Sequence, residues 1–80
     1  MIEDVRRLLN SRGVRIDVVD GICSQLAAMG ARESALFYRL ALGDTQTQAA
    51  KAVGIPQQTA SWIVGEKFKN ILDILVKSIS

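Results

Sequence analysis

Glycine recurs along this chain at a spacing that leaves room for short helices and little else. The six glycines are residues 13, 21, 30, 43, 54 and 65. Four of them directly follow a segment whose apolar residues recur at intervals of three and four, the pattern of an amphipathic helix. Glycine is favoured just after a helix because it adopts a positive φ without strain. The spacing therefore predicts short helices joined by tight turns, and no segment has the alternation expected of a strand.

Several helix starts can be recognised from single residues. Thr45 and Gln48 have the spacing of a capping box, and Asp17 is a natural N-cap. Pro56 suits a first helical turn, whereas Gly21 weakens its helix by about 1 kcal/mol relative to alanine. Helices are expected over residues 2–11, 18–29, 32–42, 45–53, from about 56, and 66–79, the last two being either separate or continuous through Gly65. The predicted fold class is all-α, a small bundle of five or six helices that contains a helix-turn-helix.

The composition argues against several classes of site. A chain of 80 residues is one small domain, which as a monomer buries only about 60% of its unfolded surface. It has no histidine and one cysteine, Cys23, so we expect no disulfide framework, no metal site and no cofactor. No export signal and no apolar run of the roughly 20 residues that span a membrane are evident, which predicts a cytoplasmic location without membrane contact. A net charge of +2 permits a nucleic-acid partner without requiring one.

Residues 45–65 have the pattern of a helix-turn-helix, in which two short helices cross steeply around a tight turn. The crossing needs small side chains, which Ala49 and Ala50 supply, and the turn needs a positive φ, which Gly54 tolerates. Apolar residues must also flank the turn and face the core. Those expected to do so are Val53, Ile55, Ala60 and Ile63. An ordinary helical hairpin needs amphipathicity alone and does not need this combination.

A longer, ungapped series of residues extends the pattern from residue 31 to about residue 72. The series is Arg32, Glu33, Leu36, Leu40, Gly43, Thr45, Gln48, Ala49, Ala50, Val53, Gly54, Ile55 and Thr59. It resembles the LuxR/GerE-type DNA-binding domain, and the promoter-reading domain of bacterial sigma factors is similar. The second helix departs from both families, because residues 57–65 contain no lysine or arginine, and its start looks more like a phage-repressor helix. The single domain 1–80 would then comprise N-terminal helices (1–30), a helix-turn-helix core (31–65) and a C-terminal helix (66–80).

The resemblance implies that the helix after Pro56 lies in the major groove with its N-terminal end nearest the bases. Gln57 and Gln58 are candidates for base contacts, because a glutamine amide can pair bidentately with adenine. Ser61 could reach a base edge or a phosphate. Trp62 is unexpected on this polar side, and it either meets a thymine methyl or sugar or packs beneath the last helix or a partner subunit.

Phosphate contacts would position such a module on DNA and supply much of its affinity. Free N–H groups at the start of the helix that follows Thr45 attract a phosphate. The candidates for phosphate contact are Thr45, Gln46, Thr47, Lys51, Lys67 and Lys69. The N-terminal arginines 6, 7, 12 and 15 are interpreted as a solvated face.

With so few cations near the motif, one copy should bind DNA weakly, which favours a homodimer. The last helix has a broad apolar stripe, part of which can cover the core and part a second copy. The candidates for the dimer interface are Phe68, Ile71, Leu72, Leu75, Val76 and Ile79, and the first helix is the alternative interface. A two-fold dimer predicts an inverted-repeat operator.

The expected function is a sequence-specific, double-stranded DNA-binding transcription regulator, stand-alone and of bacterial phage or plasmid type. The alternative is a small helical adaptor or anti-regulator that has the helix-turn-helix shape without DNA binding, as the uncharged second helix allows. An enzyme is not expected, because the carboxylates are scattered and Cys23 lies on an apolar stripe. No small-molecule ligand is evident.

Overall fold

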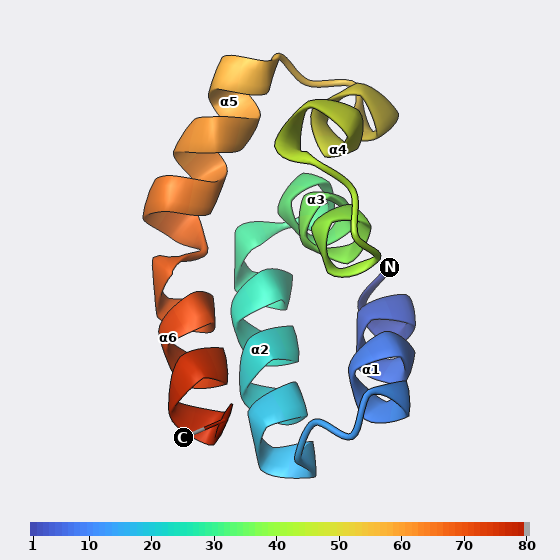
Figure 1. Ribbon diagram of the computed structural model, residues 1–80, viewed down its shortest axis with the longest axis vertical. Helices are drawn as coiled ribbons and strands as arrows, with labels where there is room; N and C mark the ends of the chain where they lie inside the picture. The colour runs from blue at the N-terminus through green and yellow to red at the C-terminus, as the bar shows by residue number, and fades with distance from the viewer. Residues whose placement is uncertain (80) are drawn as a thin grey trace.

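The computed structural model describes the backbone of residues 1–79 and the side chains of residues 1–74. Within residues 1–79 the chain forms six α-helices and one π-helical turn, with no β-strand (Figure 1). They are α1 (Ile2–Ser11), α2 (Ile16–Met29), α3 (Ala31–Ala41), α4 (Gln46–Val53), α5 (Gln57–Trp62), η1 (Ile63–Lys67) and α6 (Lys69–Ile79). The prediction of an all-α bundle is therefore confirmed. None of the helices in this range is both long and apolar enough to cross a membrane.

Helix α2 is the centre of the bundle, because α1, α3 and α6 all pack against it. Figure 1 shows α1, α2 and α6 running roughly side by side, while α3 and α4 are seen nearly end-on in the upper half of the molecule, with α4 above α3. Three α2 side chains, Val19, Ile22 and Leu26, are fully buried. Phe37 of α3 meets Phe68 edge-on, with ring centroids 5.6 Å apart, and closes the core towards α6.

The start of α2 corrects one prediction. The helix begins at Ile16, with Arg15 in an extended conformation as its N-cap, so Asp17 is not the cap. Asp17 instead lies in the first turn and pairs with Arg15 at 3.1 Å. An acidic residue is favoured both at the cap and in the first turn of a helix, and its identity alone cannot separate the two positions.

The passage from α5 to α6 corrects another prediction, that of a helix over residues 66–79. Residues Ile63–Lys67 form a π-helical turn, in which the N–H of Phe68 bonds to the carbonyl of Ile63 at 3.0 Å, and α6 begins only at Lys69. Ile63 and Phe68 are both buried, although an α-helix with about 3.6 residues per turn does not place residues five apart on one face. The wider π turn brings both side chains to the core.

Candidate functional site

Helix α4 begins as its sequence predicts. The Thr45 hydroxyl accepts a hydrogen bond from the N–H of Gln48 at 3.1 Å, and the Gln48 side chain accepts one from the N–H of Thr45 at 2.9 Å. This reciprocal capping box satisfies two backbone donors that would otherwise lack a partner in the helix. The start of α4 is thus stabilised by hydrogen bonds between residues three positions apart in sequence.

The turn after α4 depends on Gly54. Its φ of +85° and ψ of +33° are left-handed, and both its N–H and that of Ile55 bond to the carbonyl of Ala50. A Cβ built on Gly54 would meet nothing within 4 Å, so glycine is favoured here by its φ and not by lack of space. Pro56 then takes an extended conformation as the N-cap of α5, whereas the sequence predicted that it lies in the first turn of the helix.

Small side chains let α4 and α5 approach one another closely. Ala49, Ala50 and Ala60 are all buried, and Ile63 continues the buried face into η1. Val53 and Ile55 flank the turn and pack, half-buried, against the core. In Figure 1, α4 is seen nearly end-on while α5 lies in the plane of the view, so the two helices cross steeply.

The outer face of α5 is exposed along its whole length. Gln57, Gln58 and Ser61 are exposed, and Trp62 is 56% exposed. Of the two places predicted for Trp62, burial beneath α6 is therefore not observed within one copy of the chain. Ser61 donates a hydrogen bond to the side-chain oxygen of Gln46 on α4, at 2.8 Å, so these two predicted contact residues lie together.

Four of the six residues predicted to contact phosphate are exposed, and the other two, Gln46 and Lys67, are half-buried. The exposed residues are Thr45, Thr47, Lys51 and Lys69. Lys67 differs from them, because its ammonium lies 3.1 Å from a carboxylate oxygen of Glu33 and 5.5 Å from the centre of the Trp62 ring. The sequence includes Glu33 among the residues of the family resemblance, but it does not predict this ion pair, because Lys67 is distant from Glu33 along the chain.

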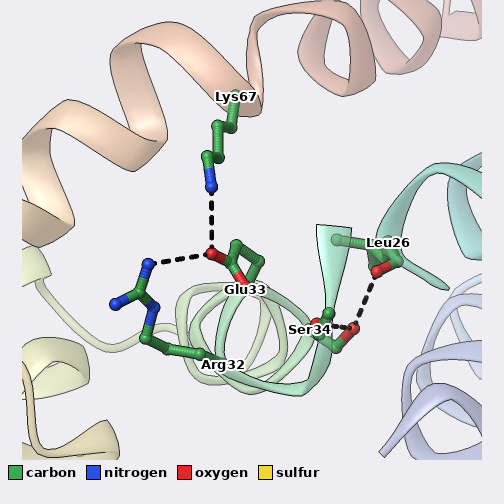
Figure 2. A network of polar contacts seen from close by, with 6 residues as sticks. Leu26, Arg32, Glu33, Ser34 and Lys67 are labelled. Carbon is green, nitrogen blue, oxygen red and sulfur yellow. Dashed lines mark hydrogen bonds and ion pairs between the residues drawn. The ribbon is translucent and has the colours of Figure 1, made fainter. Parts of the chain in front are cut away.

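Glu33 is a buried carboxylate with two cationic partners. Arg32 and Lys67 both donate to the same oxygen at 3.1 Å, as Figure 2 shows, and the Glu33 side chain is only 5% exposed. Burial by itself would raise the pKa of Glu33, but hydrogen bonds from Lys67, from its own backbone N–H and from Arg32 hold that pKa below its usual value. Glu33 is thus an anion that ties α3 to η1.

The neighbouring Ser34 connects α3 to α2. Its hydroxyl lies 2.9 Å from the carbonyl oxygen of Gly30 and 3.3 Å from that of Leu26 near the end of α2 (Figure 2). Ser34 is buried and its hydroxyl has these partners, so it carries no reactive polar group. Together with Glu33, it anchors the start of α3 to the helices on either side.

The predicted dimer residues divide between the core and the surface. Phe68 and Ile71 are buried in the protein's own core, whereas Leu72 is 46% exposed. Leu75, Val76 and Ile79 lie outside the residues whose side chains are described. Leu72 stands at the edge of an apolar groove between α1, α3 and η1–α6. The groove is lined by Leu9, Arg12, Val14, Phe37, Leu40, Ala41, Val64, Phe68 and Leu72.

The described residues gather no cluster of three or more side chains able to hold a metal ion. Cys23 is buried on α2, where burial raises the pKa of its thiol, opposed by the charge of Arg6. Comparisons with protein-family models, with curated proteins and with solved structures found no match to this chain. The function has to be inferred from the geometry of α4, α5 and their neighbours.

Proposed function

We propose that α4 and α5 form a helix-turn-helix that binds double-stranded DNA in a sequence-dependent way. The observation that carries this proposal is the contrast between the two faces of α5. Its inner face is locked onto α4 through buried alanines, while its outer face presents Gln57, Gln58 and Ser61 to solvent. A short helix that packs on α4 through small side chains, and whose outer face is polar apart from the exposed Trp62, is suited to enter a major groove.

Gln57 and Gln58 are the proposed base-reading residues, because they stand in the first turn of α5, the end that would approach the base edges. A glutamine amide carries both donor and acceptor, and a bidentate pair with adenine contributes about 1–3 kcal/mol of discrimination against the wrong base. The outward face of α5 leaves both amides accessible.

The proposed affinity comes from outside α5, which has no cationic residue. Thr45 and Thr47 lie at the N-terminus of α4, whose N–H groups and dipole attract a phosphate, and Lys51 and Lys69 are exposed cations on either side of α5. Few charges act here, which favours weak binding by one copy.

A homodimer would double these contacts, and we propose that it forms through α6. Leu72 is 46% exposed and lines the apolar groove, so an accessible apolar surface is present on each copy, and a two-fold contact would pair this surface with itself. Arg12 also lines the groove, so this surface carries a positive charge. The proposed role is a regulator of transcription, acting on DNA in the cytoplasm of a bacterium.

The exposed Trp62 also favours a second candidate function, a protein-interaction adaptor without DNA binding. A large aromatic side chain on an uncharged helix is common at protein interfaces. The two candidates differ in their response to salt. DNA binding weakens steeply as salt rises because counterions are released from the duplex, whereas an adaptor would bind no duplex even at low salt.

The test is selection of bound sites from a random pool of duplexes, followed by titration of the recovered duplex at several salt concentrations. We expect a preferred inverted repeat, and we expect the Gln57→Ala, Gln58→Ala double variant to lose that preference while its helical circular dichroism is retained. The matched control, Gln25→Ala on the distant helix α2, should keep it. Unchanged selectivity in the glutamine variant would refute base reading by α5.

A further inference from the structure

We infer that Lys67 and Glu33 are positioning residues for Trp62, and that the open face of its indole ring contacts a thymine methyl group in the major groove. Lys67 is then not a phosphate ligand, although it is a lysine beside the proposed DNA-binding helix. The DNA contact in this inference rests on the proposed function, whereas the positioning of Trp62 does not.

The positive charge of Lys67 already has two partners within the protein. Its ammonium bonds to Glu33, whose side chain is 5% exposed, and lies over the Trp62 ring within the range of a cation–π contact, 5.5 Å from the centroid. Moving Lys67 to a phosphate would take a donor away from a buried carboxylate and leave Arg32 as its one cationic partner. Loss of a partner from a buried charge is costly, which keeps the ammonium in place.

The π-helical turn is what brings Lys67 to Trp62. On an α-helix the surface neighbours of a residue are three and four positions away, whereas Lys67 is five positions after Trp62. The i to i+5 hydrogen bond between Ile63 and Phe68 widens this turn and places residues five apart over one another. The same turn therefore buries Phe68 and sets the lysine against the tryptophan.

The position of Lys67 leaves one part of the indole free. Lys67 lies over one face of the ring, yet Trp62 remains 56% exposed, so the ring presents apolar surface to solvent. That surface stands on the same exposed side of α5 as Ser61 and Gln58. A flat apolar surface beside base-reading glutamines matches the thymine methyl, the apolar group of the major groove.

The first experiment uses the fluorescence of Trp62, the single tryptophan of the chain, in the free protein. Lys67→Met removes the charge and keeps the length of the side chain, and we expect it to shift the emission maximum and lower the anisotropy of Trp62. Lys67→Arg should restore both, and Glu33→Gln should reproduce part of the change. Lys69→Met, a change at an exposed lysine two residues away, should alter neither. Unchanged Trp62 emission and anisotropy in Lys67→Met would overturn the positioning role.

The second experiment measures binding of the selected duplex across a range of salt concentrations. When a lysine that binds phosphate is removed, the slope of log affinity against log salt falls in magnitude by about 0.9 for each copy of the protein on the duplex. We expect that loss for Lys69→Met and no loss for Lys67→Met. A loss of about 0.9 per copy in Lys67→Met would show that Lys67 binds phosphate after all.

The third measurement replaces thymine by uracil in the same duplex, which removes the methyl group alone. Burial of one methyl corresponds to about a fourfold preference for thymine, and Trp62→Ala and Lys67→Met should both lose it. A preference retained by Trp62→Ala would overturn the methyl contact. If the unaltered protein bound no duplex at all, the proposed function and the methyl contact would both fail, while the fluorescence result would still decide the positioning of Trp62.

Discussion

The Ser61 hydroxyl on α5 donates a hydrogen bond to the Gln46 side-chain oxygen on α4, with 2.8 Å between the two oxygens. The two residues are far apart in sequence and belong to the two helices of the proposed helix-turn-helix. Because the Gln46 oxygen accepts this bond, its amide N–H groups stay available as donors towards a phosphate. The pair therefore couples Gln46, a proposed phosphate contact, to the helix proposed to read the bases.

This coupling predicts a non-additive response to mutation. Gln46→Ala and Ser61→Ala should each destabilise the protein slightly, and a double-mutant cycle in urea should give a coupling energy near about 0.5 kcal/mol, the lower end for a hydrogen bond, because the pair is exposed. The control cycle combines Ser61→Ala with Thr47→Ala, an exposed change on α4, and should give additive effects. Additivity in both cycles would show that the Ser61–Gln46 bond contributes nothing in solution.

Two glycines should respond to alanine in opposite directions. Gly21 lies inside α2 with nothing within 4 Å of a built Cβ, so Gly21→Ala should stabilise by about 0.5–1 kcal/mol through helix propensity and a restricted unfolded chain. Gly54 is equally unobstructed but has a φ of +85°, so Gly54→Ala should destabilise by about 1–2 kcal/mol. Each kcal/mol corresponds to roughly 4–8 °C in Tm for a domain of this size, which thermal unfolding resolves. Equal shifts of the same sign would contradict the left-handed turn at Gly54.

Features that depend on a few adjacent residues could be predicted from the sequence. The capping box of Thr45, the left-handed Gly54 and the bounds of α1 are examples, because a cap or a turn is determined within one or two helical turns. The exposed face of α5 was also predictable, since periodicity separates Gln57 and Gln58 from the buried Ala60 and Ile63.

Features that depend on residues distant in the chain could not be predicted in this way. The ion pair of Glu33 with Lys67 joins α3 to η1, and no local pattern indicates that a glutamate near a helix start is buried. The π-helical turn could not be predicted either, because the spacing of the apolar residues from Phe68 onward also fits a regular α-helix. The contact of Lys67 with Trp62, which follows from this turn, could not be predicted for the same reason.

The lowered pKa of Glu33 predicts loss of stability in acid. A carboxyl whose pKa is lower in the folded than in the unfolded state stabilises the protein above the unfolded pKa, about 4.3, and this contribution is lost as the pH falls through the folded pKa. Glu33→Gln should therefore cost about 1–3 kcal/mol at pH 7, and its difference from the unaltered protein should shrink below about pH 4. Urea unfolding between about pH 3 and about pH 7, an interval that spans the unfolded pKa, measures this difference. The control, Glu66→Gln at an exposed carboxyl of η1, should cost little at pH 7. A difference for Glu33→Gln that does not change with pH would contradict the anionic role of Glu33.

Exposed Leu72 offers a separate test of the proposed dimer. Leu72 is 46% exposed in one copy, so Leu72→Asp removes little of the monomer's core and places a charge at the edge of the apolar groove. We expect this variant to sediment as a monomer with its helical content retained, and to bind the selected duplex more weakly because the second set of phosphate contacts is lost. Asn70→Asp places the same charge at an exposed polar position of α6 and should leave the dimer intact. A Leu72→Asp protein that still sediments as a dimer would move the interface away from this face of α6, with α1 the next surface to examine, and a monomeric unaltered protein would exclude the dimer altogether.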